Sequence, residues 1–410
     1  MNPGMKRSVL LLCSLVLALS LAACAKQQAA PPSAAGQPSK QAPAFTDAAK
    51  PDYWPTAGWK TTSPEAQGMD SETLAEALQS YKDHNLHSVV VVRNGYLVAE
   101  AYSSGYQADT IQELHSATKS VTSSLVGMAV AEKKLKDLNQ KVSDYFPEIA
   151  SDPKKANMTV EHLLYMASGL DWNNNGEQSS LELMGSPDWM KYILSKPSRA
   201  EPGTVFHYSN GDAHLMSGIM QKATGQTLYD YAKPRLFEPL GITASDWKKD
   251  PQGYSIGAWS LMLTPRDMAK LGFLYMNHGV WDGRAVVPEQ WIDASWEKRA
   301  PQKFNDGTQG GYGYYWWMKQ LAPDTASAQW KQEVYFAAGS GGQRIFIVPG
   351  LKMIVAVTAN NDNEAIMPEQ LLFALAGSVK SDKALPESPE AAAKWTQAAE
   401  AFKQVKDKPE

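Results

Sequence analysis

Runs of β-branched and aromatic residues are concentrated near the two ends of the chain. The stretch from His87 to Tyr102 has two such runs on either side of Asn94-Gly95, a dipeptide that favours a tight hairpin turn because both residues accept positive φ. The stretch from Gln343 to Asn360 repeats the pattern around Pro349-Gly350. Each stretch therefore predicts an antiparallel hairpin, and we expect the two hairpins to pair in one sheet.

Segments with helical periodicity occupy the region between the hairpins. They are the run after Ser116 and the segments that begin at Thr159, Ser186, Gly211 and Thr264. Outside this insert, helices are predicted over 71–84, with Ser71 as the N-cap, and over 368–379. Strands from both ends of the chain and a mainly helical insert define an α+β fold, with a cleft where the two parts meet.

The N-terminus has the pattern of a bacterial export signal. Lys6 and Arg7 precede the apolar segment SVLLLCSLVLALSLAA, which runs into Cys24. The stretch Leu21-Ala22-Ala23-Cys24 resembles the lipobox of bacterial lipoproteins, which implies cleavage before Cys24 and acylation of its thiol and its new amino group. The alternatives are ordinary secretion or an uncleaved anchor, although the apolar segment is short against the roughly 20 residues that a membrane span needs.

Lipid attachment would hold the protein at the bacterial cell envelope, since several acyl chains form a stable anchor. Ala25 after the cysteine favours the outer membrane, facing the periplasm, and Cys13 would leave with the signal, so that no disulfide is expected. The expected divisions are a signal peptide (1–23), the acylated Cys24 with a tether rich in Ala, Gln, Pro and Ser (24–52), a folded domain (53–380), and a tail or loose helix (381–410).

Charge and histidine spacing argue against nucleic-acid and metal partners. The formal net charge is -4 at pH 7, and the chain has no long block of one sign. The seven histidines show no spacing typical of metal ligands, so neither a metal nor another cofactor is predicted, and His115 is expected to be a packed neighbour of the site. Most of the 13 tryptophans are expected in the core or at interfaces, although the adjacent pair Trp316-Trp317 could build a binding wall.

A serine and a lysine three residues apart open the helical run after the first hairpin. On a helix Ser116 and Lys119 share one face, while Val121, Leu125 and Met128 form an apolar stripe toward the core. A serine hydroxyl becomes a nucleophile when a base takes its proton, and a lysine can be that base once burial and the positive end of a helix dipole lower its pKa. The pair predicts a catalytic serine with its base; the alternative is a helix-capping serine beside a surface lysine.

Two further segments carry polar groups or glycines where a cleft is expected. In FHYSNGD, Tyr208 could pass a proton and Asn210 could hydrogen-bond an acyl amide, because both lie in a turn-like stretch before a helix. In AAGSGGQRIFIVP, Gly339, Gly341 and Gly342 precede a strand and would let a substrate approach backbone N–H groups that stabilise an oxyanion. The alternative for the glycines is a β-bulge or a tight turn.

Together these segments resemble the three ordered motifs of serine β-lactamases and penicillin-binding proteins. The motifs stand at Ser116-Ala117-Thr118-Lys119, Tyr208-Ser209-Asn210 and Ser340-Gly341-Gly342. The tyrosine form of the second motif is similar to the class C branch, which includes carboxylesterases, D-aminopeptidases and 6-aminohexanoate-oligomer hydrolases. The resemblance extends from about Ser63 to Val379 and implies the β-lactamase/transpeptidase-like fold.

The resemblance also implies a role for each motif residue. Ser116 would be the acylated nucleophile, Lys119 the base that activates it, and Tyr208 the group that protonates the leaving amine or alkoxide. The oxyanion hole would consist of the backbone N–H groups of Ser116 and Gln343. The motif residues expected to contact the substrate are Asn210, Ser340, Gly341 and Gly342. Asp171 and Trp172 follow the turn Ser168-Gly169-Leu170 and could also line the cleft, although packing in the core is an equal alternative for Trp172.

One departure from the family pattern affects the substrate. The third motif of β-lactamases usually begins with a lysine that helps bind the carboxylate of the drug, and Ser340 stands there instead, which puts efficient β-lactam hydrolysis in doubt. Arg344 would point away from the cleft if the strand alternates from Gln343.

We therefore expect a lipid-tethered serine hydrolase that cleaves a small-molecule ester or amide through an acyl-enzyme. One alternative is a D-alanyl-D-alanine carboxypeptidase or β-lactamase acting on peptidoglycan-like substrates. Another is a non-catalytic envelope binding protein that keeps this fold.

Overall fold

The computed structural model describes residues 52–321, 331–362 and 366–408. The expected signal peptide, Cys24 and nearly all of the expected tether lie outside these residues. In the part of the chain that the structure describes, no helix combines the length and apolar character that crossing a bilayer requires.

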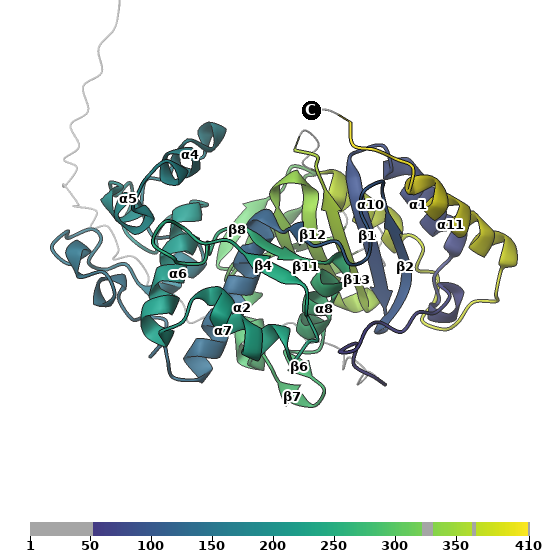
Figure 1. Ribbon diagram of the computed structural model, residues 1–410, viewed down its shortest axis with the longest axis horizontal. Helices are drawn as coiled ribbons and strands as arrows, with labels where there is room; N and C mark the ends of the chain where they lie inside the picture. Colours follow the sequence, from purple (N-terminus) through teal and green to yellow (C-terminus); the bar gives the residue numbers. More distant parts are fainter. Residues whose placement is uncertain (1–51, 322–330, 363–365, 409–410) are drawn as a thin grey trace, which may run out of the picture. The chain divides into compact units, whose positions relative to one another are not determined.

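The main element is an eight-stranded antiparallel sheet with the strand order β2-β1-β13-β12-β11-β10-β9-β8 (Figure 1). Its strands are β1 (Leu86–Arg93), β2 (Tyr96–Tyr102), β8 (Ala300–Lys303), β9 (Gln309–Tyr312), β10 (Trp317–Gln320), β11 (Glu333–Gly339), β12 (Gln343–Val348) and β13 (Met353–Ala359). The turn after β1 is at Asn94-Gly95, and the turn before β13 is at Pro349–Leu351. Both hairpins are therefore confirmed.

The first and last parts of the chain meet in this sheet, because β1 pairs with β13 in an antiparallel register that places Val89 opposite Val357 and Val91 opposite Val355. The expected pairing of the two hairpins is confirmed. Shorter strands form a three-stranded sheet of β3 (Gln112–Glu113), β5 (Leu261–Leu263) and β4 (Ser245–Trp247), and a hairpin of β6 (Val280–Trp281) and β7 (Arg284–Ala285).

The helices lie on both faces of the main sheet and in the insert. They are α1 (Ser71–Tyr81), α2 (Thr118–Ala131), α3 (Val160–Leu164), α4 (Gln178–Met184), α5 (Trp189–Ser195), α6 (Asn210–Thr224), α7 (Leu228–Ala232), α8 (Pro265–Met276), α9 (Glu289–Ser295), α10 (Met367–Ala376) and α11 (Pro389–Phe402). Helices α2 to α7 make up most of the insert, so the prediction of an α+β fold is confirmed.

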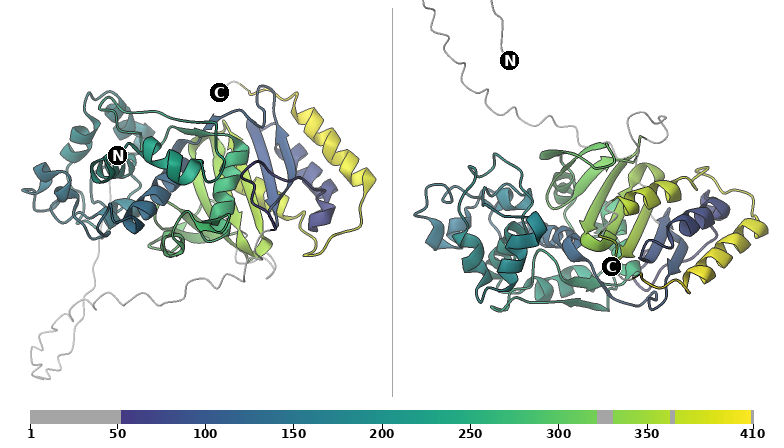
Figure 2. Two further views of the ribbon diagram at one scale, coloured as in Figure 1. Left: turned by 60° about the horizontal axis from the view of Figure 1, so that its bottom comes forward. Right: turned by 90° about the horizontal axis from the view of Figure 1, so that it is seen from above.

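The sheet separates two hydrophobic cores, and this explains why β1 is an unbroken apolar run rather than an alternating one. Val90 and Val92 belong to the core that includes α2, α6 and α8, whereas Val89 and Val91 belong to the core beneath α1, α10 and α11. Figure 2 shows α1 and α11 side by side over the second face. A strand covered on both faces holds its position firmly, and β11 lies in the same sheet, three positions from β1 in the strand order.

Two local expectations need correction. The N-cap of α1 is Asp70, whose Oδ1 accepts the Thr73 N–H at 2.8 Å, and Ser71 is instead a buried first-turn residue whose hydroxyl donates to Glu65. The segment expected as a tail or loose helix contains α11, which packs against α1 and buries Phe402 completely. Helix α11 thus closes the second core.

Candidate active site

Ser116 lies in a short 3-10 turn, His115–Ala117, that leads directly into α2. The turn begins with His115 at φ 45°, a left-handed conformation that is uncommon outside glycine. Almost every residue of α2 is buried, including Val121, Leu125 and Met128 of the expected apolar stripe. The helix is therefore fixed in the core, and it holds Ser116 beside the end of β11, an interior strand of the main sheet.

Lys119 is buried in the first turn of α2, with only 1% of its surface exposed. Its Nζ lies 2.9 Å from the Ser116 Oγ, 2.7 Å from the Asn210 Oδ1 and 2.9 Å from the carbonyl oxygen of Ala258. The expected contact between the serine and the lysine is present. It joins the first motif to the second through Asn210.

Burial lowers the pKa of Lys119 to about 7, although the negative charge of Glu177 opposes the shift. The carbonyl of Ala258 and the Oδ1 of Asn210 can only accept hydrogen bonds. A neutral amine has two N–H groups, which satisfy these two acceptors, and one lone pair, which then faces the Ser116 hydroxyl. The geometry suits a base that takes the serine proton.

Asn210 is the first residue of α6, after the N-cap Ser209. Its Nδ2 donates to the Ser180 Oγ at 2.9 Å, and this contact orients the amide oxygen toward Lys119. Its position in the site agrees with the prediction. The amide oxygen, however, accepts a hydrogen bond from the Lys119 amine and does not point freely into the cavity.

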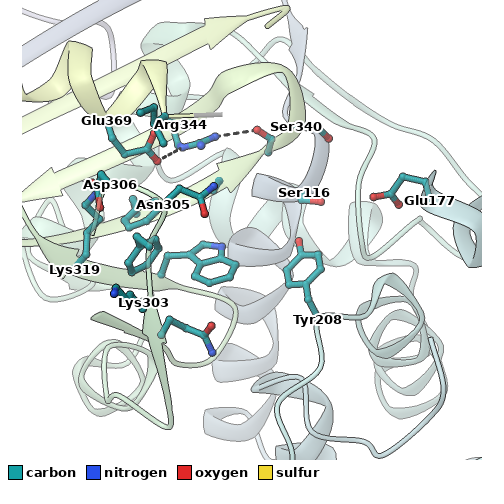
Figure 3. A pocket seen from close by; sticks show the side chains of 17 residues that line it. Ser116, Glu177, Tyr208, Lys303, Asn305, Asp306, Lys319, Ser340, Arg344 and Glu369 are labelled. Atoms are coloured by element: carbon teal, nitrogen blue, oxygen red, sulfur yellow. Dashed lines mark hydrogen bonds and ion pairs between the residues drawn. The ribbon is translucent and has the colours of Figure 1, made fainter. Parts of the chain in front are cut away.

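Tyr208 lies beside Ser116 on the wall of the same cavity, and its hydroxyl points toward the Ser116 hydroxyl (Figure 3). The Tyr208 ring stacks on Trp317 with ring centroids 6.0 Å apart, and the Lys119 Nζ lies 4.8 Å from the ring centroid. Burial raises the pKa of Tyr208 well above its usual value. The phenol therefore keeps its proton near neutral pH and can pass it on to a leaving group.

The third segment reaches Ser116 through the end of β11. Gly339, the last residue of β11, lies so close to the nucleophile turn that a Cβ would come within 2.2 Å of the Leu114 carbonyl oxygen. Glycine is required here because the strand and the turn are in backbone contact. Ser340 follows in a 3-10 turn and lines the same cavities as Ser116.

Gln343 does not reach the site. It begins β12, pairs with Gly339 across the hairpin, and its side chain donates to the Ala359 carbonyl oxygen at 2.6 Å within the interior. Gly341 and Gly342 form the turn between β11 and β12, at φ 73° and 99°, and Gly341 donates to Asp362. Ser116 and Ser340 line both cavities at the site, whereas Gln343 lines neither.

Asp171 and Trp172 were expected to contact the substrate, and the structure places neither at Ser116. Trp172 is 1% exposed and packs against Gly211 at the start of α6. Asp171 precedes it on the surface and lines neither of the cavities that contain Ser116. Trp172 is therefore a core residue that packs against the start of α6, next to the second motif.

A cavity of about 450 Å³ opens beside Ser116 and Tyr208, with Ser340 on its wall (Figure 3). Its apolar wall consists of Phe304, Trp317 and Phe336, and its polar wall includes Arg344 and Glu369. Of the adjacent tryptophans, Trp317 lines this cavity and Trp316 is buried in the core. Of the two tryptophans that could build a binding wall, only Trp317 contributes to this cavity.

Among the charged residues of the cavity, Arg344 was misplaced by the prediction and Glu177 was missed. Arg344, expected to point away, lines the cavity and pairs with Glu369, with Nε 3.0 Å from Oε1. Glu177, just before α4, approaches Ser116 from the side opposite Arg344 (Figure 3). His115 is half-exposed beside Ser116, where it lines a smaller cavity. In the described ranges, no cluster of His, Cys, Asp and Glu side chains is arranged to hold a metal.

Comparison with known proteins agrees with this constellation, because residues 74–376 match the family model described as Beta-lactamase. The chain belongs to the beta-lactamase family. It is similar to the 6-aminohexanoate-dimer hydrolase of Paenarthrobacter ureafaciens, with 24% identity over 267 residues that cover 60% of this chain and 67% of that protein. It is also similar to the lovastatin esterase of Penicillium rubens, with 27% identity over 203 residues that cover 42% of this chain and 48% of that protein.

A solved class C beta-lactamase from Rhodobacter sphaeroides has the same fold. The TM-score is 0.59 at 19% identity, and the superposition covers 76% of this chain and all of that one. This confirms the β-lactamase/transpeptidase-like fold. The family and the hydrolases among its relatives also identify the chain as an enzyme of the serine hydrolase type.

The lowered pKa of Lys119 predicts a specific pH dependence for this beta-lactamase-family enzyme. Below about pH 7 the amine is protonated and cannot accept the serine proton, so kcat/KM should rise about tenfold for each pH unit below the pKa and level off above it. The measurement is kcat/KM for a neutral ester from pH 5 to 9. A profile that is still rising tenfold per pH unit at pH 9 would show that Lys119 retains an ordinary pKa.

Proposed function

We propose that the protein hydrolyses ester or amide bonds of small molecules through a covalent acyl-enzyme on Ser116. The observation that carries this proposal is the position of the buried Lys119 amine, 2.9 Å from the Ser116 Oγ and held by two obligate acceptors. A merely structural lysine would expose its charge to water, because burial of an ammonium costs several kcal/mol. Here the burial has a chemical use, since it produces the base.

In the acylation step, the Ser116 Oγ forms a bond to the substrate carbonyl carbon and its proton moves to the Lys119 Nζ. The carbonyl becomes an oxyanion, which the backbone N–H groups of Ser116 and Ser340 stabilise. The bond to the leaving amine or alkoxide then breaks, and the proton passes from Lys119 through Tyr208 to that group. The product of this step is a Ser116 ester and a free amine or alcohol.

In the deacylation step, water replaces the leaving group. The water oxygen attacks the ester carbonyl, and its proton reaches the Lys119 Nζ by way of the Tyr208 hydroxyl, which passes one proton on as it accepts another. Collapse of the second oxyanion breaks the bond to Ser116, and the serine oxygen recovers a proton. The enzyme is restored and the substrate has become an acid and an amine or alcohol.

The third segment offers no lysine for the carboxylate that β-lactams and D-alanyl-D-alanine peptides carry, and this favours esters and simple amides as substrates. The third segment contributes Ala338, Gly339 and Ser340 to the cavity, with no lysine among them. Arg344 is the cation that follows this segment, and Glu369 already neutralises it. The aromatic wall around Trp317 instead fits an apolar acyl or alkyl group.

The N-terminal sequence supports attachment of this enzyme to a membrane. The lipobox-like stretch before Cys24 and the Ala- and Pro-rich tether would hold the domain at the bacterial outer membrane, facing the periplasm. Replacement of Cys24 by Ala should move the protein from the detergent phase to the aqueous phase in phase separation, and an unlipidated mass for the wild-type protein would contradict it.

A direct test of the nucleophile uses intact-mass analysis of the full-length protein. After exposure to a fluorophosphonate, wild-type protein should gain one phosphonyl group, and Ser116→Ala should gain none. Exposure to a penicillin should give little adduct or turnover. A stable penicillin adduct would favour the cell-wall alternative, and a phosphonate adduct on Ser116→Ala would contradict the assignment of Ser116.

The oxyanion hole can be tested at Ser340, because proline removes the backbone N–H. Gly339 is extended (φ -127°, ψ 153°), as the residue before a proline must be, so Ser340→Pro can be accommodated. Loss of one oxyanion donor should lower kcat about 100-fold to 1,000-fold relative to Ser340→Ala, which keeps the N–H. Equal kcat values for these two variants, at equal thermal stability, would place the second donor elsewhere.

A further inference from the structure

Two cavities meet at Ser116, and they differ in character. The larger one, of about 450 Å³, contains the aromatic wall and the paired charges described above. The smaller one, of about 270 Å³, lies toward α4. Ser116, Ser340 and Glu177 line both of them. A substrate whose scissile bond lies at Ser116 therefore has one part in each cavity, and Glu177 borders both parts.

Glu177 is a carboxylate without a cationic partner in the described part of the chain. It accepts a hydrogen bond from the Ser180 hydroxyl at 3.0 Å. Its backbone is left-handed (φ 55°, ψ 27°), as is that of Gly176 before it (φ 55°). This conformation costs energy in a non-glycine residue. It directs the side chain toward Ser116 (Figure 3).

The rest of the smaller cavity suits a cation on an apolar stem. Trp259 lines the cavity, and its ring is held against Trp189 with centroids 5.6 Å apart. Indole faces attract ammonium groups, particularly beside a carboxylate. Leu181 and Met184 of α4 also line the cavity and are 58% and 50% exposed, an unusual exposure for large apolar side chains.

We propose that the smaller cavity binds an ammonium group of the substrate, and that Glu177 is the residue that selects for it. The carboxylate of Glu177 attracts the cation, Trp259 presents its ring to it, and Leu181 and Met184 cover the methylene chain that joins it to the scissile bond. A substrate carboxylate in the same place would be repelled. This inference deepens the proposed hydrolase function and rests on it.

The test uses two pairs of esters in which a trimethylammonium group is compared with its neutral tert-butyl isostere. One pair places the group in the acyl part: p-nitrophenyl esters of 6-(trimethylammonio)hexanoic acid and 7,7-dimethyloctanoic acid. The other places it in the alcohol part: choline hexanoate and 3,3-dimethylbutyl hexanoate. Because each pair has the same shape, the ratio of their kcat/KM values reports recognition of charge. Measurement at pH 8.5 keeps Lys119 neutral in every variant.

The expected result is a preference for the cationic ester in at least one pair, and Glu177→Gln should lower that ratio about threefold to tenfold. Glu201→Gln is the matched control, because it removes an exposed carboxylate that lines neither cavity. In that variant the ratio should stay at the wild-type value. Hydrolysis of the neutral esters by Glu177→Gln should persist, which shows that the catalytic groups remain in place.

The outcomes separate the inference from the function on which it rests. If wild-type protein hydrolyses the neutral esters in a Ser116-dependent manner but Glu177→Gln leaves both ratios unchanged, the ammonium site is wrong and the hydrolase function stands. If Glu201→Gln lowers the ratio as much as Glu177→Gln does, the effect comes from the net charge of the protein, and the proposed ammonium site is also wrong. If Ser116→Ala hydrolyses all four esters as fast as wild-type protein, both proposals fail.

Discussion

The burial of one amine organises the active site. The Lys119 Nζ is removed from water and held by the Asn210 side chain and the Ala258 carbonyl, so its remaining valence faces Ser116. Desolvation disfavours the ammonium form and brings the pKa to about 7. Each partner comes from a different part of the chain. The site therefore exists only when α2 with the turn before it, α6 and the segment before β5 are packed together.

The sheet supplies the second constraint, which is the close approach of β11 to the nucleophile turn. Gly339 allows contact between the strand and the Leu114 carbonyl, and this contact brings Ser340 beside Ser116. The pairing of β1 with β13 and the helices on both faces keep the strands from shifting. Catalytic distances of about 3 Å therefore depend on a core that extends well beyond the cavity.

The parts of the site that depend on local sequence were predictable, and those that depend on where distant segments meet were not. The hairpin at Asn94-Gly95 and the spacing of Ser116 and Lys119 are encoded within a few residues, and the structure has both. Tyr208 followed from its motif. The glycine run predicts a strand that begins at Gln343 and faces Ser116, whereas the strand beside Ser116 is β11, which ends at Gly339.

The remaining errors have the same origin. If the cleft lay along β12, side-chain alternation from Gln343 would direct Arg344 away from it. The cleft lies instead at the end of β11, and Arg344 lines its wall. For Trp172 the structure shows the packing alternative, because its side chain fills the space above Gly211 in the core. Glu177 had no local signal, since its importance comes only from the left-handed turn that aims it across the cavity.

The most direct test of the central claim is the titration of the Lys119 amine itself by NMR. Lysine labelled with ¹³C at Cε reports the charge of each amine, and comparison with Lys119→Met identifies the signal. The account predicts that this amine titrates near pH 7, well below the usual range of lysine. A Lys119 signal that stays in the ammonium form up to pH 10 would contradict it, because the amine would then be a charged neighbour of Ser116 rather than its base.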